Sequence, residues 1–276
     1  MSRKSLINNL LEGVRSVANR WATNPYSAMG LNVWQVKALK HLPEGKLRSW
    51  RIAGHPLSFT SPMELVHGLK EIFAEKIYDQ VLPKNAYILD CGANIGLSVI
   101  YLKKCCPSAH ILAFEPDPVN FGLLQKNIDS FGLKNVTAHQ SAIWKENTTL
   151  NFQSAGSMGS SIDTETNAGG ISVNAMRLKD LLDRPVDFLK IDIEGAEYEV
   201  IKDAADSLHL VNRMFLEYHG RFDQNDELLE MLNIVRAAGF KFYIREAAPV
   251  HPVPFRPNRS GALPYDVQLN IFCLRD

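Results

Sequence analysis

The chain has 276 residues, and its 30 Lys and Arg balance its 30 Asp and Glu, so the formal charge is zero at pH 7. A balanced charge excludes the strong basic field with which general nucleic-acid binders attract phosphates. The composition, 46% hydrophobic and 22% charged, is that of a globular rather than a disordered protein. No apolar run approaches the ~20 residues that span a bilayer, so we expect a soluble protein without a transmembrane segment.

The first predicted element is an amphipathic helix, because apolar residues recur at three- and four-residue steps from Ile7 to Trp21. Its apolar face would pack against the main domain or a second copy of the chain, giving a homo-oligomer. Alternatively, its basic face would attach peripherally to an anionic membrane. Polar residues interrupt the apolar run that a signal peptide would need. The four cysteines lack the spacing typical of disulfide frameworks or zinc sites, so we expect a cytoplasmic location.

The next residues predict a small appendage of helices and short strands. The expected elements are a helix, two strands and a longer helix, over 33–42, 47–52, 57–59 and 62–80. The boundary to a larger domain is placed near Leu82-Pro83. We therefore predict an appendage over 1–81 and a catalytic-sized domain over 82–276.

From residue 86 onward, short apolar strands alternate with helices. This alternation is typical of an α/β domain with a parallel sheet that helices cover on both faces. Strands are expected over 86–90, 110–115, 136–140, 188–191, 213–218, 240–245 and 267–274, and helices over 95–104, 118–130, 197–204 and 225–238. Two further segments, Thr148–Phe152 and Ile171–Arg177, are predicted as edge or hairpin strands around a stretch rich in Gly, Ser and Thr.

The most informative motif is Asp-Cys-Gly-Ala-Asn-Ile-Gly at 90–96, where a strand turns into a helix. Gly92 and Gly96 permit close approach of a ligand to the backbone and leave N–H groups free at the start of the helix. The spacing differs from the GxGxxG fingerprint of dinucleotide-binding sheets. Because a carboxylate can take an ammonium group, Asp90 suits a ligand with a cationic amino-acid portion.

A second motif, Phe-Glu-Pro at 114–116, ends the next strand. Glu115 would therefore lie beside the first turn, where its two oxygens can accept hydrogen bonds from two ribose hydroxyls. Pro116 directs the chain out of the sheet. No following arginine suggests a ribose 2′-phosphate, so the two motifs together predict a nucleoside site.

A third motif crowds carboxylates at the ends of two later strands. Asp192 follows one predicted strand, and Glu217 and His219 end the next one. Together they would supply a general base or a cation site lined by oxygen and imidazole. If a divalent ion takes part, Asp192 and Glu217 would be its ligands, but the spacing does not require a metal and we assign none. Glu194 and Glu197 equally suit stabilisation of a helix N-terminus.

These motifs, in this order and with these intervals, resemble the FkbM family of S-adenosylmethionine-dependent methyltransferases, from about Phe59 to Cys273. The resemblance implies a Rossmann-like seven-stranded sheet flanked by helices, with the last strand antiparallel and inserted beside the fifth. It also implies S-adenosylmethionine as cofactor, with Glu115 on the ribose and Ser141-Ala142 near the adenine. The implied cofactor-binding residues are Asp90, Gly92, Asn94, Gly96, Glu115, Pro116, Ser141, Ala142 and Asp192.

Family activity implies methyl transfer to an oxygen of a sugar, glycan or glycosylated secondary metabolite. Asp192 and His219 would accept the hydroxyl proton or orient the acceptor, with Glu217 in support. By the implied topology, the connection before the last strand opens on the ligand edge, which makes His251, Arg256 and Arg259 candidates for acceptor recognition. No Asn/Asp-Pro-Pro-Tyr/Phe block follows the fourth strand, so we do not expect a nucleic-acid substrate.

Two alternatives belong to other functional classes. An NAD-dependent oxidoreductase could use a similar sheet, but the chain lacks both the GxGxxG spacing and a Tyr-x-x-x-Lys pair. A non-catalytic nucleoside-binding scaffold acting through the N-terminal helix is the other alternative. It would have no need for carboxylates at three strand ends.

Overall fold

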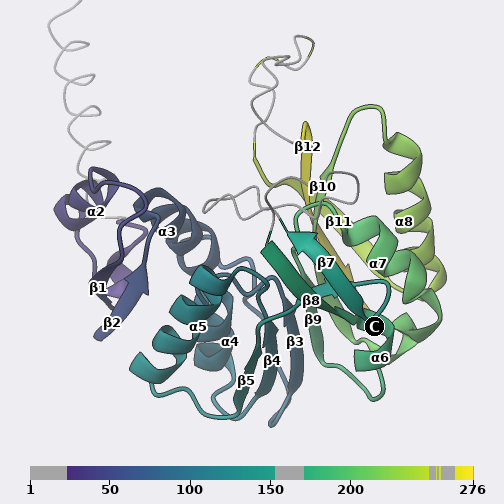
Figure 1. Cartoon of the computed structure of the whole chain (residues 1–276), viewed down its shortest axis with the longest axis horizontal. Helices are drawn as coiled ribbons and strands as arrows, with labels where there is room; N and C mark the ends of the chain where they lie inside the picture. Colours follow the sequence, from purple (N-terminus) through teal and green to yellow (C-terminus); the bar gives the residue numbers. More distant parts are fainter. Residues whose placement is uncertain (1–23, 153–170, 249–252, 254, 256–264, 276) are drawn as a thin grey trace, which may run out of the picture. The chain divides into compact units, whose positions relative to one another are not determined.

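The computed structural model describes residues 24–152, 171–248, 253, 255 and 265–275 (Figure 1). The chain divides into two compact units between Ile77 and Tyr78, and each unit is described by itself. Three features of the sequence lie outside the described residues. They are the expected N-terminal helix, the stretch 153–170 and the candidate acceptor residues His251, Arg256 and Arg259.

The N-terminal unit consists of short helices and one hairpin. Its elements are the 3-10 turn η1 (Ser27–Met29), α2 (Val33–Lys40), the antiparallel strands β1 (Arg48–Ile52) and β2 (His55–Phe59), α3 (Pro62–Gly68) and the π-helical turn η2 (Leu69–Ala74). The prediction of one helix up to residue 80 was wrong at its C-terminal end. The backbone widens to π-helical hydrogen bonding after Gly68, and Lys76 then adopts a positive φ of 57° that ends the helical path.

The C-terminal unit contains the alternating strands and helices that the sequence predicts. Strands are β3 (Tyr87–Cys91), β4 (His110–Phe114), β5 (Val136–His139), β6 (Ala142–Trp144), β7 (Thr148–Phe152), β8 (Ile171–Arg177), β9 (Phe188–Ile191), β10 (Arg213–Gly220), β11 (Lys241–Glu246) and β12 (Val267–Leu274). Helices are α4 (Leu97–Cys105), α5 (Pro118–Ser130), α6 (Leu178–Leu181), α7 (Glu197–Asp203), the 3-10 helix η3 (Ala205–Leu210) and α8 (Asn225–Ala237).

Seven of these strands form one sheet, in the order β11-β12-β10-β9-β3-β4-β5. Strands β3, β4, β5, β9 and β10 pair in parallel, whereas β12 runs antiparallel to both β10 and β11. The last strand in the chain is therefore inserted beside the fifth strand of the sheet. This confirms the predicted Rossmann-like sheet and its antiparallel ending.

A second, three-stranded sheet has the order β6-β8-β7. Strands β7 and β8 pair antiparallel, as a predicted hairpin would, but neither extends the main sheet. Strand β6 was not predicted, because three residues are too short to show the two-residue alternation of a strand. Its side chains are buried, so tertiary packing rather than local pattern defines it.

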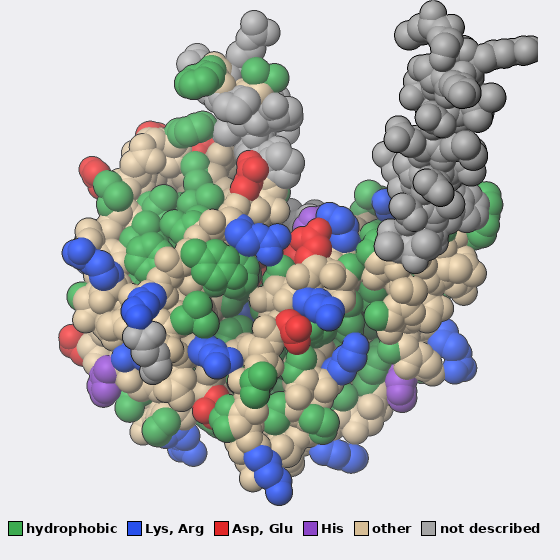
Figure 2. Space-filling model, turned by 180° about the vertical axis from the view of Figure 1, so that it is seen from behind, with side chains coloured by type: hydrophobic (Ala, Val, Ile, Leu, Met, Phe, Trp, Pro, Cys, Tyr) green, Lys and Arg blue, Asp and Glu red, His purple; other side chains and the backbone are tan. Residues whose placement is uncertain are grey.

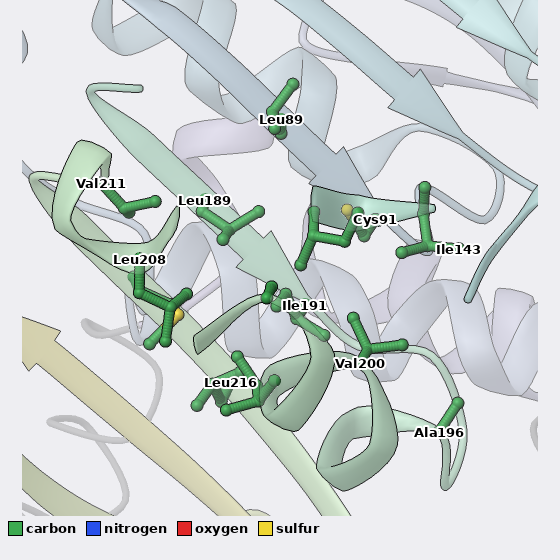
Figure 3. Packing of buried hydrophobic residues seen from close by; sticks show 14 of the residues in the cluster. Leu89, Cys91, Ile143, Leu189, Ile191, Ala196, Val200, Leu208, Val211 and Leu216 are labelled. Atoms are coloured by element: carbon green, nitrogen blue, oxygen red, sulfur yellow. The ribbon is translucent and has the colours of Figure 1, made fainter. Parts of the chain in front are cut away.

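Helices cover the two faces of the main sheet separately. On one face, Leu89 and Cys91 of β3 and Ile191 of β9 join a continuous apolar core with Val200 of α7 and Leu216 of β10 (Figure 3). On the opposite face, side chains of α4 approach β3, and α5 packs next to α4 (Figure 1). Because alternate residues of a strand point to opposite faces, β3 sends Leu89 and Cys91 into this core and Asp90 toward α4.

On the face that Figure 2 displays, Lys and Arg side chains are interspersed with acidic and uncharged ones. This distribution agrees with the zero formal charge of the sequence. Among the described residues, no helix combines the length and the apolar character that crossing a membrane requires.

Replacing Leu216 by Ala should lower the free energy of unfolding by about 2–5 kcal/mol, because it leaves a cavity in the apolar core. Leu216 is fully buried, whereas Leu229 on α8 is 58% exposed and provides the matched control. Urea unfolding followed by circular dichroism measures both variants. Equal effects of Leu216→Ala and Leu229→Ala would contradict the core as described.

Candidate active site

The turns after β3 and β9 lie against each other at the carboxyl edge of the sheet. Gly92 has a φ of +84°, and a Cβ atom built on it would lie 1.8 Å from the backbone oxygen of Asp192. The backbone N–H groups of Gly92 and Ala93 both donate to the carbonyl oxygen of Phe114, at the end of β4. Only glycine fits at position 92, since the left-handed conformation disfavours a side chain and the close contact excludes one.

A buried lysine joins these two turns. The Nζ atom of Lys190 donates to the carbonyl oxygen of Gly92 at 2.7 Å. The same atom lies 3.2 Å from Oδ2 of Asp192 and 3.5 Å from Oδ1 of Asp90. Burial acts to lower the pKa of Lys190, but the two carboxylates outweigh burial and the pKa is raised. Lys190 is therefore a charged group that neutralises part of a buried acidic cluster.

Asp90 is completely buried on the face of the sheet that α4 covers. Its Oδ2 atom accepts a hydrogen bond of 2.5 Å from the hydroxyl of Ser98 on α4. Its Oδ1 atom has the ion pair with Lys190 but no hydrogen-bond partner among the described residues. Asp90 thus fixes the beginning of α4 and the ammonium group of Lys190 at the same time.

Glu115 lies beside the turn after β3, as the sequence predicts. Its Oε2 atom accepts from the backbone N–H of Asn94 at 2.8 Å, and its Oε1 atom from that of Asp117 at 3.0 Å. Burial raises the pKa of Glu115 to about 7, although both N–H donors act to lower it. Each oxygen keeps a further lone pair, so the carboxylate can accept two more hydrogen bonds.

Ser141 follows β5 at the same edge of the sheet. The residue is buried, and its Oγ atom has no hydrogen-bond partner among the described residues. Buried hydroxyls are nearly always paired, so the Oγ atom of Ser141 is available to a water molecule or a ligand. Ala142 begins β6 directly behind it, and Pro116 is partly buried after Glu115.

His219 is the centre of a second cluster. Its Nδ1 atom lies 3.2 Å from Oε1 of Glu197, and its Nε2 atom lies 3.6 Å from Oε2 of Glu194 and 3.7 Å from Oε1 of Glu217. The side chain of His219 is 3% exposed. Burial acts to lower the pKa of His219, but Glu197 and the nearby carboxylates raise it to about 10, and burial raises the pKa of Glu194 to about 7.

Glu197 connects this cluster to the turn after β9. It is completely buried, and its carboxylate accepts from the backbone N–H groups of Ile193 and Gly195 at 3.1 and 3.0 Å. The hydroxyl of Tyr265, just before β12, donates to the carbonyl oxygen of Glu194, and its ring lies 5.1 Å from that of His219. These contacts hold Glu194 at its positive φ of 56°.

The structure brings most of the predicted site residues into two adjoining groups. The first contains Asp90, Gly92, Asn94, Gly96, Glu115 and Asp192, and the second contains Asp192, Glu217 and His219. Ser141, Ala142 and Pro116 occupy the ends of the neighbouring strands.

Sequence reasoning missed several residues of the site. Lys190 was not assigned a role, although a single lysine in the otherwise apolar strand Phe188–Ile191 is itself a signal. Ser98 and Tyr265 give no such signal, because their roles depend on contacts between distant segments. Glu197 does occupy the first turn of α7, as stabilisation of a helix start would require, but it also binds His219.

Comparison with known proteins tests the family that the sequence motifs indicate. Residues 90–242, more than half of the chain, match the model of the family described as Methyltransferase FkbM domain. Methyltransferase 1 of Beauveria bassiana is 32% identical in an alignment of 173 positions that covers 52% of this chain and 68% of the relative. Methyltransferase sdnD of Sordaria araneosa is 33% identical over 171 positions, covering 48% of this chain and 66% of the relative.

A third relative carries the name of a substrate class. Hexuronic acid methyltransferase AglP of Haloferax volcanii is 25% identical over 198 positions, covering 67% of this chain and 81% of the relative. The chain spans about two thirds of the length of the two fungal relatives.

Replacing Lys190 by Met should lower the free energy of unfolding by about 3–5 kcal/mol, because it leaves the buried Asp90 carboxylate without a counter-charge. Lys202→Met removes an exposed lysine, 3.1 Å from Glu230, and should change stability far less. Chemical denaturation of the two variants at neutral pH provides the comparison. A Lys190→Met protein as stable as Lys202→Met would show that the buried ion pair is not needed.

Proposed function

The chain belongs to the FkbM methyltransferase family, and on that premise we propose that it is an S-adenosylmethionine-dependent O-methyltransferase. The proposed acceptor is a hydroxyl group of a small polar molecule, namely a sugar, glycan or glycosylated secondary metabolite. The observation that carries the proposal is the position of Asp192. Its backbone oxygen contacts Gly92, its carboxylate pairs with Lys190, and the same carboxylate belongs to the cluster with Glu194 and His219.

The residues present fit the cofactor. The turn at Gly92 has no room for a side chain, which suits close approach of a ligand to the backbone. Glu115 has its two oxygens fixed by backbone N–H groups and would hold the ribose hydroxyls. The unpaired buried hydroxyl of Ser141 would hydrogen-bond the adenine.

Asp90 keeps its place in the proposed cofactor site, but acts there through its neighbours. Its carboxylate is completely buried and already engaged by Ser98 and Lys190. We therefore assign it to positioning the turn at 92–96, rather than to direct contact with the amino-acid end of the cofactor.

When bound, S-adenosylmethionine supplies a methyl group on a positively charged sulfur, which an acceptor oxygen displaces in line. The protein must then orient the acceptor and remove its hydroxyl proton. The side chains of Asp192 and Glu217 are 25% and 19% exposed, so their carboxylates are accessible proton acceptors. His219 has carboxylates on both ring nitrogens and is assigned to orienting them.

The acceptor class rests on chemistry and on one relative. Sugars present several hydroxyl donors, which suit a cluster of carboxylates, and the name of AglP specifies a hexuronic acid. His251, Arg256 and Arg259 remain the proposed acceptor-binding residues. We further propose that the substrate is not a nucleic acid and that the protein is cytoplasmic. Its N-terminal helix would serve self-association or peripheral membrane contact.

The proposed function is tested by binding and by product analysis. Calorimetry should detect binding of S-adenosylmethionine and S-adenosylhomocysteine but not of NAD. Incubation of the protein and S-adenosylmethionine with uronic acids and glycosides should give products heavier by one CH₂. Treatment with mild base distinguishes the two possible acceptor groups. A methyl ether formed on a hydroxyl survives the treatment, whereas a methyl ester formed on a carboxylate is hydrolysed. Binding of NAD alone would favour an oxidoreductase, and base-labile products would refute the hydroxyl acceptor.

The affinity for S-adenosylhomocysteine should depend on pH through Glu115. With its pKa raised to about 7 by burial, Glu115 is largely protonated at pH 6 and loses capacity to accept the ribose hydroxyls. Affinity should therefore fall about tenfold from pH 8 to pH 6. The charged groups acting on Glu115 are Asp117, which raises its pKa, and Lys190, which lowers it.

Glu115→Gln is the matched control, because glutamine keeps the shape but does not titrate. This variant should bind more weakly at pH 8 and show a flatter pH profile. An unchanged tenfold dependence in Glu115→Gln would assign the titration to another group.

Asp192→Asn should slow methyl transfer in a single turnover by about 10²–10⁴-fold, because it removes a proton acceptor. Affinity for S-adenosylhomocysteine should change less, since an amide oxygen can still contact Lys190. The acceptor identified by product analysis serves as substrate, and Asp226→Asn on the exposed start of α8 is the control. Unimpaired transfer by Asp192→Asn would remove Asp192 from the proposed mechanism.

A further inference from the structure

We propose that Asp192, Glu194 and His219 bind a divalent cation, such as Mn²⁺ or Mg²⁺, at the place where the acceptor oxygen meets the cofactor. Each residue offers one ligand atom, and the three atoms lie within 4.8 Å of one another. The role assigned to the ion rests on the proposed O-methyl transfer. Its binding rests on the geometry, hydrogen bonding and charge of the residues around it.

The distances suit one ion. Two ligand atoms that each lie ~2.1 Å from an ion are about 3.0–4.2 Å apart, depending on the angle between them. Nε2 of His219 and Oε2 of Glu194 are 3.6 Å apart, inside that range. All three ligand atoms lie within 4.8 Å of one another, and the side chains of Asp192 and Glu194 are partly exposed, so small movements can bring them to one ion.

The hydrogen bonding of His219 supports a metal more than the carboxylates alone do. Nδ1 contacts the carboxylate of Glu197, which itself is fixed by two backbone N–H groups. If Nδ1 donates this bond, the lone pair of Nε2 faces the carboxylates of Glu194 and Glu217, at 3.6 and 3.7 Å. A buried histidine oriented by a carboxylate on its other nitrogen is the arrangement found around protein-bound metals.

The charges around the three residues also favour a cation. Among the described residues, Lys190 and His219 face five carboxylates, those of Asp90, Asp192, Glu194, Glu197 and Glu217. Removing carboxylates from water is costly unless opposite charge compensates them. Two charges on one ion would supply that compensation. The two carboxylate ligands suit Mn²⁺ and Mg²⁺, and the imidazole nitrogen makes Mn²⁺ the better fit of the two.

An ion at this place would act on the acceptor. It would bind the acceptor hydroxyl oxygen and favour loss of its proton, and it would select molecules with two neighbouring oxygens that can chelate it. Asp192 would then be a ligand, and the hydroxyl proton would pass to the carboxylate of Glu217. The carbon–oxygen bond still forms as the carbon–sulfur bond breaks, so the ion changes acceptor activation and not the group transferred.

The competing interpretation is that the Nε2 proton of His219 already balances the carboxylates and no ion binds. Electron paramagnetic resonance distinguishes the two, because the signal of free Mn²⁺ disappears on binding. Chelator-treated, full-length protein should bind one Mn²⁺ per chain, and Mg²⁺ should compete for it. Absence of binding at about 1 mM Mn²⁺ would overturn the proposal.

Variants assign the ligands. Asp192→Asn, Glu194→Gln and His219→Gln should each weaken Mn²⁺ binding at least about tenfold, and Glu197→Gln by about 10–100-fold through the orientation of His219. Asp226→Asn is the control and should bind as the unmodified protein does. Thermal unfolding verifies that each variant is folded, and the near-isosteric Asp192→Asn and Glu194→Gln change partly exposed side chains. Unchanged binding in folded ligand variants would refute the assigned site.

The same samples are titrated with S-adenosylhomocysteine in the absence of metal. Binding of S-adenosylhomocysteine without binding of Mn²⁺ refutes the metal site and leaves the proposed function standing. Binding of Mn²⁺ without S-adenosylhomocysteine supports the metal site and counts against the proposed function. Failure of both overturns both.

Discussion

The site depends on one buried ammonium group. Lys190 places its Nζ atom between the turns that follow β3 and β9, where it contacts a carbonyl oxygen of the first turn and a carboxylate from each strand. Without this positive charge, Asp90 and Asp192 would repel each other in a region from which water is largely excluded. The close contact between Gly92 and the backbone of Asp192 requires these two turns to stay together.

The other residues of the site are connected to these two turns. The first turn reaches Glu115 through the backbone of Asn94, and the second reaches His219 through Glu197. Non-glycine residues adopt positive φ in both turns, Asn94 at 47° and Glu194 at 56°. Such conformations are costly and persist where the surrounding contacts over-determine them. The two proposed binding regions are thus parts of one rigid arrangement, so a change at Lys190 should affect both.

Sequence reasoning predicted the strand ends that form the site but not all of the side chains that meet there. Strand ends could be predicted because apolar runs and glycine turns are local patterns, and parallel strands bring their carboxyl ends to one edge. The sheet order followed from the resemblance to a family. The partners of a buried charge could not be predicted, because Lys190 is paired with Asp90 a hundred positions earlier in the chain. For the same reason Ser98 and Tyr265 were missed, and the short strand β6 has no pattern of its own.

The antiparallel last strand is the basis for proposing acceptor recognition on the connection before it. Val267 at the start of β12 lies opposite Gly220 at the end of β10, and Glu246 at the end of β11 lies opposite Leu269. Both ends of the connection 247–266 therefore lie at the edge where Glu217 and His219 emerge. Had the strand run parallel, its first residue would have been at the opposite edge. Tyr265 shows that this connection adjoins the site, because its hydroxyl donates to the carbonyl oxygen of Glu194.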